Sequence, residues 1–125
     1  MIEYISYYTR PLIRANRTKL FVFGDNACRT GLGGQAGEAR FEPNTIGIAT
    51  KWAPTMVESA FFNDGDEGAW ALVNKDLARV TEALNAGRIV VVPHDGVGTG
   101  LSQMPKRCPR LLAHINSILF PEETP

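Results

Sequence analysis

The apolar residues of this chain fall into short continuous runs, separated by polar connections that contain glycine or proline. Four runs, rich in β-branched and aromatic residues, predict strands over residues 2–8, 20–23, 46–49 and 88–93. The second and fourth runs contain successive apolar residues, which is typical of strands buried on both faces of a sheet. We therefore expect a sheet that is covered on both sides by helices.

The stretches between these strands show helical spacing instead. After Asp66, a favourable N-cap, apolar residues recur at intervals of three and four until Gly87, which predicts one long helix. Its apolar face consists of Trp70, Val73, Leu77, Val80 and Leu84. A short helix is predicted over residues 35–40, and a last one begins at Pro105 and ends before Pro121. This alternation of strands and helices predicts an α/β protein.

Length and composition narrow the class further. With 125 residues, 44% of them hydrophobic, the chain is expected to form a single domain, residues 1–125, whose core needs no metal or disulfide. Cys28 and Cys108 are expected to be free thiols, and no apolar run approaches the roughly 20 residues of a membrane span. These features predict a cytoplasmic protein without membrane contact. The 13 basic and 13 acidic residues cancel, which argues against a general nucleic-acid binder.

Glycine is the most informative residue type, because eight of the 12 glycines lie in two windows that each follow a predicted strand. The first window holds Gly24, Gly31, Gly33, Gly34 and Gly37, and the second holds Gly96, Gly98 and Gly100. In α/β sheets, ligands bind at the carboxyl ends of strands, so both windows are expected on one edge. Glycine backbones can approach an anion closely, and a helix after Gly34 would add its positive dipole end. Two such loops favour a phosphate-bearing ligand, whereas a flexible turn is the alternative for either loop alone.

Three charged residues near the predicted strand ends are candidates for chemistry. Lys51 follows the third strand, where desolvation would lower the pKa of its amine and make it a nucleophile; a solvated surface lysine is the alternative. Asp25 and Asp95 lie in the glycine windows and can act as acids, bases or acceptors for ribose hydroxyls, or can shape their loops. His94 and His114 have no metal-ligand spacing with the cysteines. Neither a metal nor another cofactor is expected.

The two glycine windows together resemble a known family. VFGDNACRTGLGGQAGEAR is similar to the macrodomain pattern of a strand, an asparagine, a glycine-rich loop and a helix, and VVVPHDGVGTGLSQMP resembles that family's second phosphate loop. The resemblance covers roughly residues 20–119 and implies a three-layer α/β/α fold with a mixed sheet. Macrodomains bind ADP-ribose, and many remove it from proteins, nucleic acids or metabolites. Compact phage-encoded macro-like proteins share the FVFGDN type of opening.

Within the macrodomains, the chain is most similar to the branch of terminal ADP-ribose protein glycohydrolase and the antitoxins that reverse DNA ADP-ribosylation. In that branch a Thr-Lys pair at a strand end carries the catalytic lysine, and IATKWAP has Lys51 at this position. The GxGL of the second loop precedes an aspartate in the family, where this chain has Ser102. The resemblance therefore implies Lys51 as the catalytic residue and Asp95 as the carboxylate that replaces the missing aspartate.

The resemblance also implies how a ligand would lie, with its diphosphate across both loops and its distal ribose at Asn26. The residues expected to contact the ligand are Asp25, Asn26, Gly33, Gly34, Gln35, Gly96, Gly98, Thr99, Gly100 and Leu101. Three functions stay open: hydrolysis of ADP-ribosyl linkages, binding of ADP-ribose or a related NAD-derived nucleotide without turnover, and a structural α/β domain. The expected partners are ADP-ribose or an ADP-ribosylated macromolecule, and nucleic acid is expected only as a modified substrate.

Overall fold

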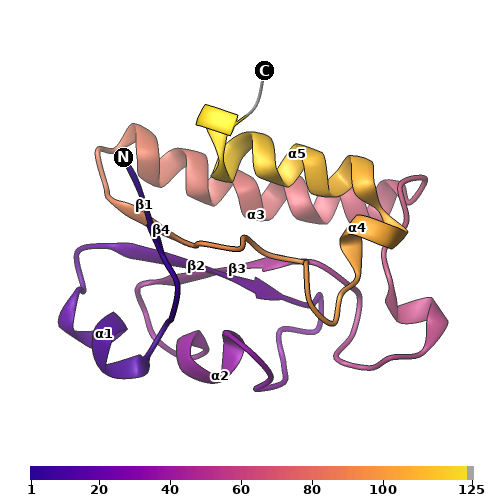
Figure 1. Cartoon of the computed structure of the whole chain (residues 1–125), viewed down its shortest axis with the longest axis horizontal. Helices are drawn as coiled ribbons and strands as arrows, with labels where there is room; N and C mark the ends of the chain where they lie inside the picture. The colour runs from indigo at the N-terminus through magenta and orange to yellow at the C-terminus, as the bar shows by residue number, and fades with distance from the viewer. Residues whose placement is uncertain (124–125) are drawn as a thin grey trace.

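The computed structural model describes residues 1–123 and contains one four-stranded sheet (Figure 1). The strands are β1 (Ile2–Ile5), β2 (Leu20–Asp25), β3 (Thr45–Ala49) and β4 (Val90–Pro93), in the order β1-β4-β2-β3. The three pairings between these strands are all parallel, because each strand returns to the sheet through a helical connection. The predicted α/β class is confirmed, whereas the described sheet is parallel rather than mixed.

Helices cover both faces of the sheet (Figure 1). They are α1 (Arg10–Ala15), α2 (Ala36–Ala39), α3 (Glu67–Asn85), α4 (Met104–Arg107) and α5 (Pro109–Leu119), with 3₁₀ turns at Glu58–Ala60 and Pro121–Glu123. The helices α3 and α5 lie on one face, and α1 and α2 lie on the other. The last predicted helix is divided in two at Cys108, whose backbone is not helical (φ −149°, ψ 65°); the proline that follows disfavours the helical conformation there. The first predicted strand ends at Ile5 rather than at residue 8.

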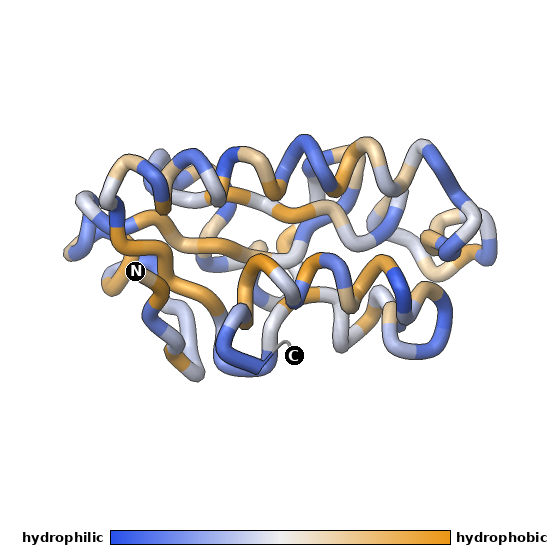
Figure 2. Tube along the Cα trace, turned by 90° about the horizontal axis from the view of Figure 1, so that it is seen from above, coloured by the Kyte–Doolittle hydropathy of each residue, from blue (hydrophilic) through white to orange (hydrophobic). Residues whose placement is uncertain are grey.

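Alternate residues of the strands supply two hydrophobic cores, one on each face of the sheet. Val22, Val90 and Val92 pack with the buried residues of α3 and α5. Phe21 and Val91 face the other way, toward α1 and α2. The predicted apolar face of α3 packs against the first core as expected. In Figure 2, hydrophobic segments follow the strands, while hydrophilic and hydrophobic residues alternate along the helices.

The pairing between β2 and β4 stops after two residue pairs, because Pro93 cannot continue it. The Leu20 amide donates to the Ile89 carbonyl, and the regular parallel pattern would next bring the nitrogen of Pro93 to the Val22 carbonyl. Proline has no N–H group to donate. The buried hydroxyl of Tyr8 takes its place, 2.7 Å from the Val22 oxygen and 2.9 Å from the Val91 oxygen. Burial raises the pKa of Tyr8, so the hydroxyl keeps its proton.

Replacement of Tyr8 by phenylalanine is expected to lower the free energy of unfolding by about 1–3 kcal/mol, because a buried carbonyl loses its donor. Tyr7→Phe is the matched control, since the Tyr7 side chain is exposed. Urea unfolding of the two variants provides the measurement. Equal stability of Tyr8→Phe and the wild type would contradict this role for the Tyr8 hydroxyl.

One buried carboxylate joins the segments that lead into β2 and β3. Glu42 pairs with Arg10 and Arg14 of α1 and with Arg17, which precedes β2. Burial opposes the charge on Glu42, but the hydrogen bonds from Arg14, Arg10 and Arg17 outweigh it and lower the pKa of this carboxyl to about 2. Asn44 contacts three backbone carbonyls of the same region through its Nδ2. The amino ends of β2 and β3 are thus anchored to α1.

The lowered pKa of Glu42 predicts a specific loss of stability in acid. The stabilisation by this group is complete above its ordinary pKa of 4.5 and is lost as the pH falls toward about 2. Glu42→Gln should therefore show a weaker loss of unfolding free energy than the wild type over this pH range. Urea unfolding at a series of pH values measures the difference. If both proteins lose the same free energy between these pH values, Glu42 does not carry this dependence.

Candidate functional site

The ends of β2, β3 and β4 meet at one edge of the sheet. A Cβ atom built on Gly24, near the end of β2, would lie 3.5 Å from the Val97 Cβ of the loop after β4. The hydroxyl of Thr50, directly after β3, lies 2.6 Å from the hydroxyl of Ser102 in that same loop. The chain leaves β2 toward α2 on one face and leaves β4 toward α4 and α5 on the other (Figure 1). In open α/β sheets, ligands bind in the crevice between two neighbouring strands whose connections leave on opposite faces of the sheet.

A side chain replaces the missing strand pairing on the β2 side of this edge. The Gly24 amide donates to the Oε1 atom of Gln35 over 3.1 Å. The regular pattern directs this amide toward β4, whose pairing with β2 has ended before this point. Gln35 is predicted as a ligand contact, but its side-chain carbonyl oxygen accepts the hydrogen bond of the Gly24 amide within the protein.

The glycine loops carry backbone N–H groups that have no partner within residues 1–123. In that part of the chain, no protein acceptor receives a hydrogen bond from the amides of Gly33, Gly34, Gly98, Thr99, Gly100 or Leu101. Some loop amides are used by the loops themselves, since Gly96 donates to Pro93 and Met104 donates to Gly98, whereas the amides of Gly31, Leu32, Val97 and Ser102 also have no acceptor within residues 1–123. The six amides named first lie on exposed or half-buried residues and can therefore donate to a ligand.

Asn26 adds an unused acceptor directly after β2. Its Nδ2 donates to the Thr30 carbonyl over 2.7 Å, and its backbone amide donates to the Asp25 carboxylate. Its buried Oδ1 atom accepts no hydrogen bond from the described residues. An unsatisfied buried acceptor is costly, and a hydroxyl donor at this position would satisfy it. Asn26 thus has an unused acceptor, and its role as a ligand contact stays a prediction.

Asp25 is occupied by structural ion pairs. Its Oδ1 lies 2.5 Å from the Nη2 of Arg40, a buried arginine, and its Oδ2 lies 3.5 Å from Arg29. Arg29 also contacts both carboxylate oxygens of Asp76, which lies on α3. These pairs connect β2 with α3 and with the end of α2. Nothing in the sequence pattern distinguished these two arginines from solvated surface residues.

The structure gives separate surroundings to Lys51 and Asp95. Lys51 is only 7% exposed, and its ammonium donates to the Thr55 carbonyl over 2.9 Å and contacts the Met56 sulfur and the Phe61 ring. Burial lowers the pKa of Lys51. The Asp95 side chain is 93% exposed, and its Oδ1 lies 3.6 Å from the Nδ1 of His94. Ser102, which the macrodomain resemblance matches to an aspartate, lies beside Thr50.

The glycines of the two loops differ in what the fold requires of them. Gly98 has a φ of 81°, and a Cβ atom there would collide with Met104, so the fold needs glycine at this position. A Cβ atom on Gly33 or Gly100 meets nothing within 4 Å, and neither residue has a positive φ. The helix after the first loop, α2, has four residues, so the helix dipole expected there is small. Any anion site depends on the loop amides themselves.

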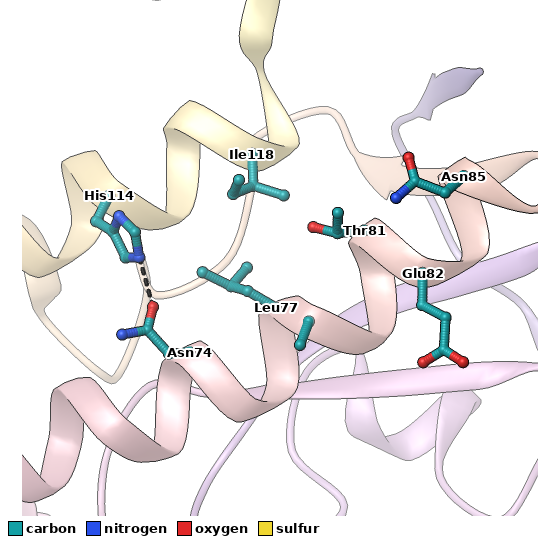
Figure 3. Close-up of a pocket in the computed structure, with 8 residues that line it drawn as sticks. Asn74, Leu77, Thr81, Glu82, Asn85, His114 and Ile118 are labelled. Atoms are coloured by element: carbon teal, nitrogen blue, oxygen red, sulfur yellow. Dashed lines mark hydrogen bonds between the residues drawn. The ribbon is translucent and has the colours of Figure 1, made fainter.

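Two surface hollows lie away from these loops. One, of about 510 Å³, separates α3 from α5 and is crossed at one end by a hydrogen bond between His114 and Asn74 (Figure 3). The other, of about 450 Å³, is lined by Trp52, Phe61 and Arg107 among others, and Arg107 stacks on the Phe61 ring. Neither hollow includes a residue of the glycine loops. Residues 1–123 contain no cluster of metal-ligating side chains.

By its fold and edge geometry, the chain is a parallel α/β protein with two glycine loops, in which six of the amides have no acceptor within residues 1–123. Residues 3–118 match a family of unknown function, DUF7831, and this match spans most of the chain. The chain therefore belongs to that family. No curated protein and no solved structure matches it. None of the helices within residues 1–123 has the length and apolarity to span a bilayer.

The glycine geometry predicts opposite results for two neighbouring substitutions. Gly98→Ala should lower the free energy of unfolding by about 1–2 kcal/mol or more, because alanine is disfavoured at positive φ and would displace Met104. Gly100→Ala should leave stability unchanged or raise it slightly. Thermal and urea unfolding of both variants measure the contrast. Equal destabilisation by both would show that the loop is more tightly packed at Gly100 than described.

Proposed function

We propose that this chain binds ADP-ribose or a related NAD-derived nucleotide at the edge where β2 and β4 separate. The observation that carries the proposal is the set of six loop amides that have no acceptor within residues 1–123. The diphosphate would accept hydrogen bonds from these amides, on Gly33 and Gly34 on one side and residues 98–101 on the other. The identity of the nucleotide comes from the macrodomain resemblance, and the phosphate chemistry comes from the loops.

The charge distribution supports amide-based recognition of the phosphates. The arginines near this edge, Arg29 and Arg40, are already paired with Asp25 and Asp76. Lys51 points its ammonium toward the Thr55 carbonyl. Oriented backbone dipoles can bind a small dianion without a basic surface, which agrees with a formal net charge of zero.

The side chain of Asn26 supports a ligand that contains a ribose. Its Oδ1 is a buried acceptor with no described partner, located directly after β2 and one residue from the Asp25 anchor. A ribose hydroxyl would satisfy this atom at the distal end of the ligand once the groups that cover it move aside. The buried Nδ2 contact with the Thr30 carbonyl fixes the orientation of the amide. This arrangement favours a ligand that combines phosphates with a sugar.

The positions of Asp95, Lys51 and Ser102 favour binding of the nucleotide without hydrolysis. The exposed Asp95 carboxylate has no contact with Lys51 among the described interactions, and Ser102 cannot act as a carboxylate base. Hydrolysis of an ADP-ribosyl linkage is the second candidate, and one observation favours it. Lys51 is buried and its pKa is lowered, so its amine is a better nucleophile than that of a solvated lysine.

The binding proposal predicts that a larger side chain at Gly100 weakens the affinity for ADP-ribose at least tenfold while the fold stays intact. Gly100 has room for a Cβ in the folded protein, so the effect would come from blocking the ligand's approach. Calorimetric titration of Gly100→Val against the wild type measures it. Gly65→Val is the matched control, because Gly65 also has room for a Cβ and lies in the turn before α3.

Two outcomes would contradict the proposal. One is the absence of heat and of a thermal shift for the wild type at millimolar ADP-ribose. The other is an equal loss of affinity in both valine variants. To separate binding from hydrolysis, the wild type and Lys51→Ala are incubated with ADP-ribosylated protein and DNA. Release of ADP-ribose by the wild type alone supports catalysis by Lys51, and no release by either supports binding without turnover.

A further inference from the structure

Phe41 is an aromatic residue that the fold does not bury. It lies between α2 and β3, its side chain is 84% exposed, and its φ is 72°, a conformation that favours glycine or asparagine. Neither the core nor the backbone geometry accounts for a phenylalanine here. Its neighbours Arg40 and Glu42 are buried and ion-paired, so they fix the strained backbone in place. The ring is therefore presented to solvent by a rigid frame.

Arginines lie along the same amino edge of the sheet. Arg14 and Arg17 both contact Glu42, the residue after Phe41, and their side chains are 60% and 44% exposed. Arg88, just before β4, donates from its Nε to the Thr18 carbonyl and has no ion pair among residues 1–123. The Nη atoms of Arg14 donate no hydrogen bond within the same residues. Arg14 and Arg88 thus keep guanidinium N–H groups without acceptors at the sheet edge where Phe41 lies, whereas Arg17 also donates from its Nη1 to Asn44.

The charges of these arginines are not cancelled locally. Arg10, Arg14 and Arg17 share the single carboxylate of Glu42, which leaves two positive charges in surplus, and Arg88 adds a third. Lys19 is paired with Glu3, and Glu38, on α2, accepts the backbone amide of Arg10 at the start of α1. The strand order places these residues across the starts of β4, β2 and β3, a width of about 10 Å. The surplus positive charge therefore forms a strip along the starts of these three strands.

We propose that this strip, which we call the Phe41 surface and define by Phe41, Arg14, Arg17 and Arg88, binds single-stranded nucleic acid. An exposed aromatic ring stacks on an unpaired base, and the neighbouring guanidinium groups contact successive phosphates. A duplex hides the faces of its bases, so a single strand fits the ring better. The surface lies at the opposite edge of the sheet from the glycine loops, and this inference does not rest on nucleotide binding there.

The proposal is compatible with a formal net charge of zero, because only a few phosphates are contacted. Three phosphate contacts on a single strand correspond to a slope of about −2 in log K against log salt. The expected binding is weak and moderately dependent on salt, unlike that of a general nucleic-acid binder. Stacking on Phe41 supplies the part of the affinity that salt does not remove.

The test measures fluorescence anisotropy of a labelled 12-nucleotide single-stranded DNA titrated with the full chain at several salt concentrations. The expected result is binding with a slope of about −2, tighter than to a duplex of the same length. Phe41→Ala should weaken it by about fivefold or more without lowering the Tm.

Phe41→Gly should weaken binding equally while raising the Tm, because glycine relieves the positive φ. Arg88→Gln should weaken binding and reduce the slope.

Two control variants and one competing probe make the result decisive. Tyr7 is as exposed as Phe41 but follows β1 at the other edge, and Arg79 is an exposed arginine of α3. Tyr7→Ala and Arg79→Gln should therefore leave binding unchanged. The proposal is overturned if no binding occurs at low salt, or if Phe41→Ala and Tyr7→Ala have the same effect. Equally tight binding of a polyglutamate peptide would assign the surface to acidic proteins instead and would also overturn it.

Discussion

The absence of an N–H group on Pro93 is the constraint on which the arrangement of this edge depends. Because Pro93 cannot donate to the Val22 carbonyl, the pairing of β2 with β4 ends early, and Tyr8 and Gln35 supply side-chain hydrogen bonds in its place. The loops that follow the two strands then leave on opposite faces of the sheet while staying in contact near Gly24. Pro93, which pairs with Ile5 of β1 but ends the pairing of β4 with β2, therefore lies where the two loops diverge.

Charged and neutral groups have separate tasks in this molecule. The buried ion pairs of Asp25, Asp76 and Glu42 join strands to helices, and breaking such a pair leaves an uncompensated buried charge. The glycine loops contain the opposite kind of group, neutral amides without internal partners. Under the proposed function, such a site would recognise phosphate by the direction of its N–H groups. This division explains how a chain of zero net charge can be proposed to bind an anion.

Much of the fold could be predicted from the sequence, because continuous apolar runs and helical spacing report directly on burial. The long helix with its Asp66 cap and Gly87 end, the buried strand before Pro93 and the placement of both glycine loops on one edge are local patterns. The pairing partners of Arg29 and Arg40 could not be predicted, because they lie far away in the sequence. The burial of Lys51 also depends on tertiary packing, since its ammonium contacts Thr55, Met56 and Phe61.

The central claim is that the free amides of the two glycine loops bind the phosphates of a nucleotide. Titration of isotope-labelled protein with ADP-ribose, followed by amide chemical shifts in NMR spectra, tests it most directly. The account predicts the largest shifts at Gly33, Gly34 and residues 98–101, with little change in the hollow between α3 and α5. Large shifts confined to other surfaces, or no shifts at saturating ligand, would contradict it.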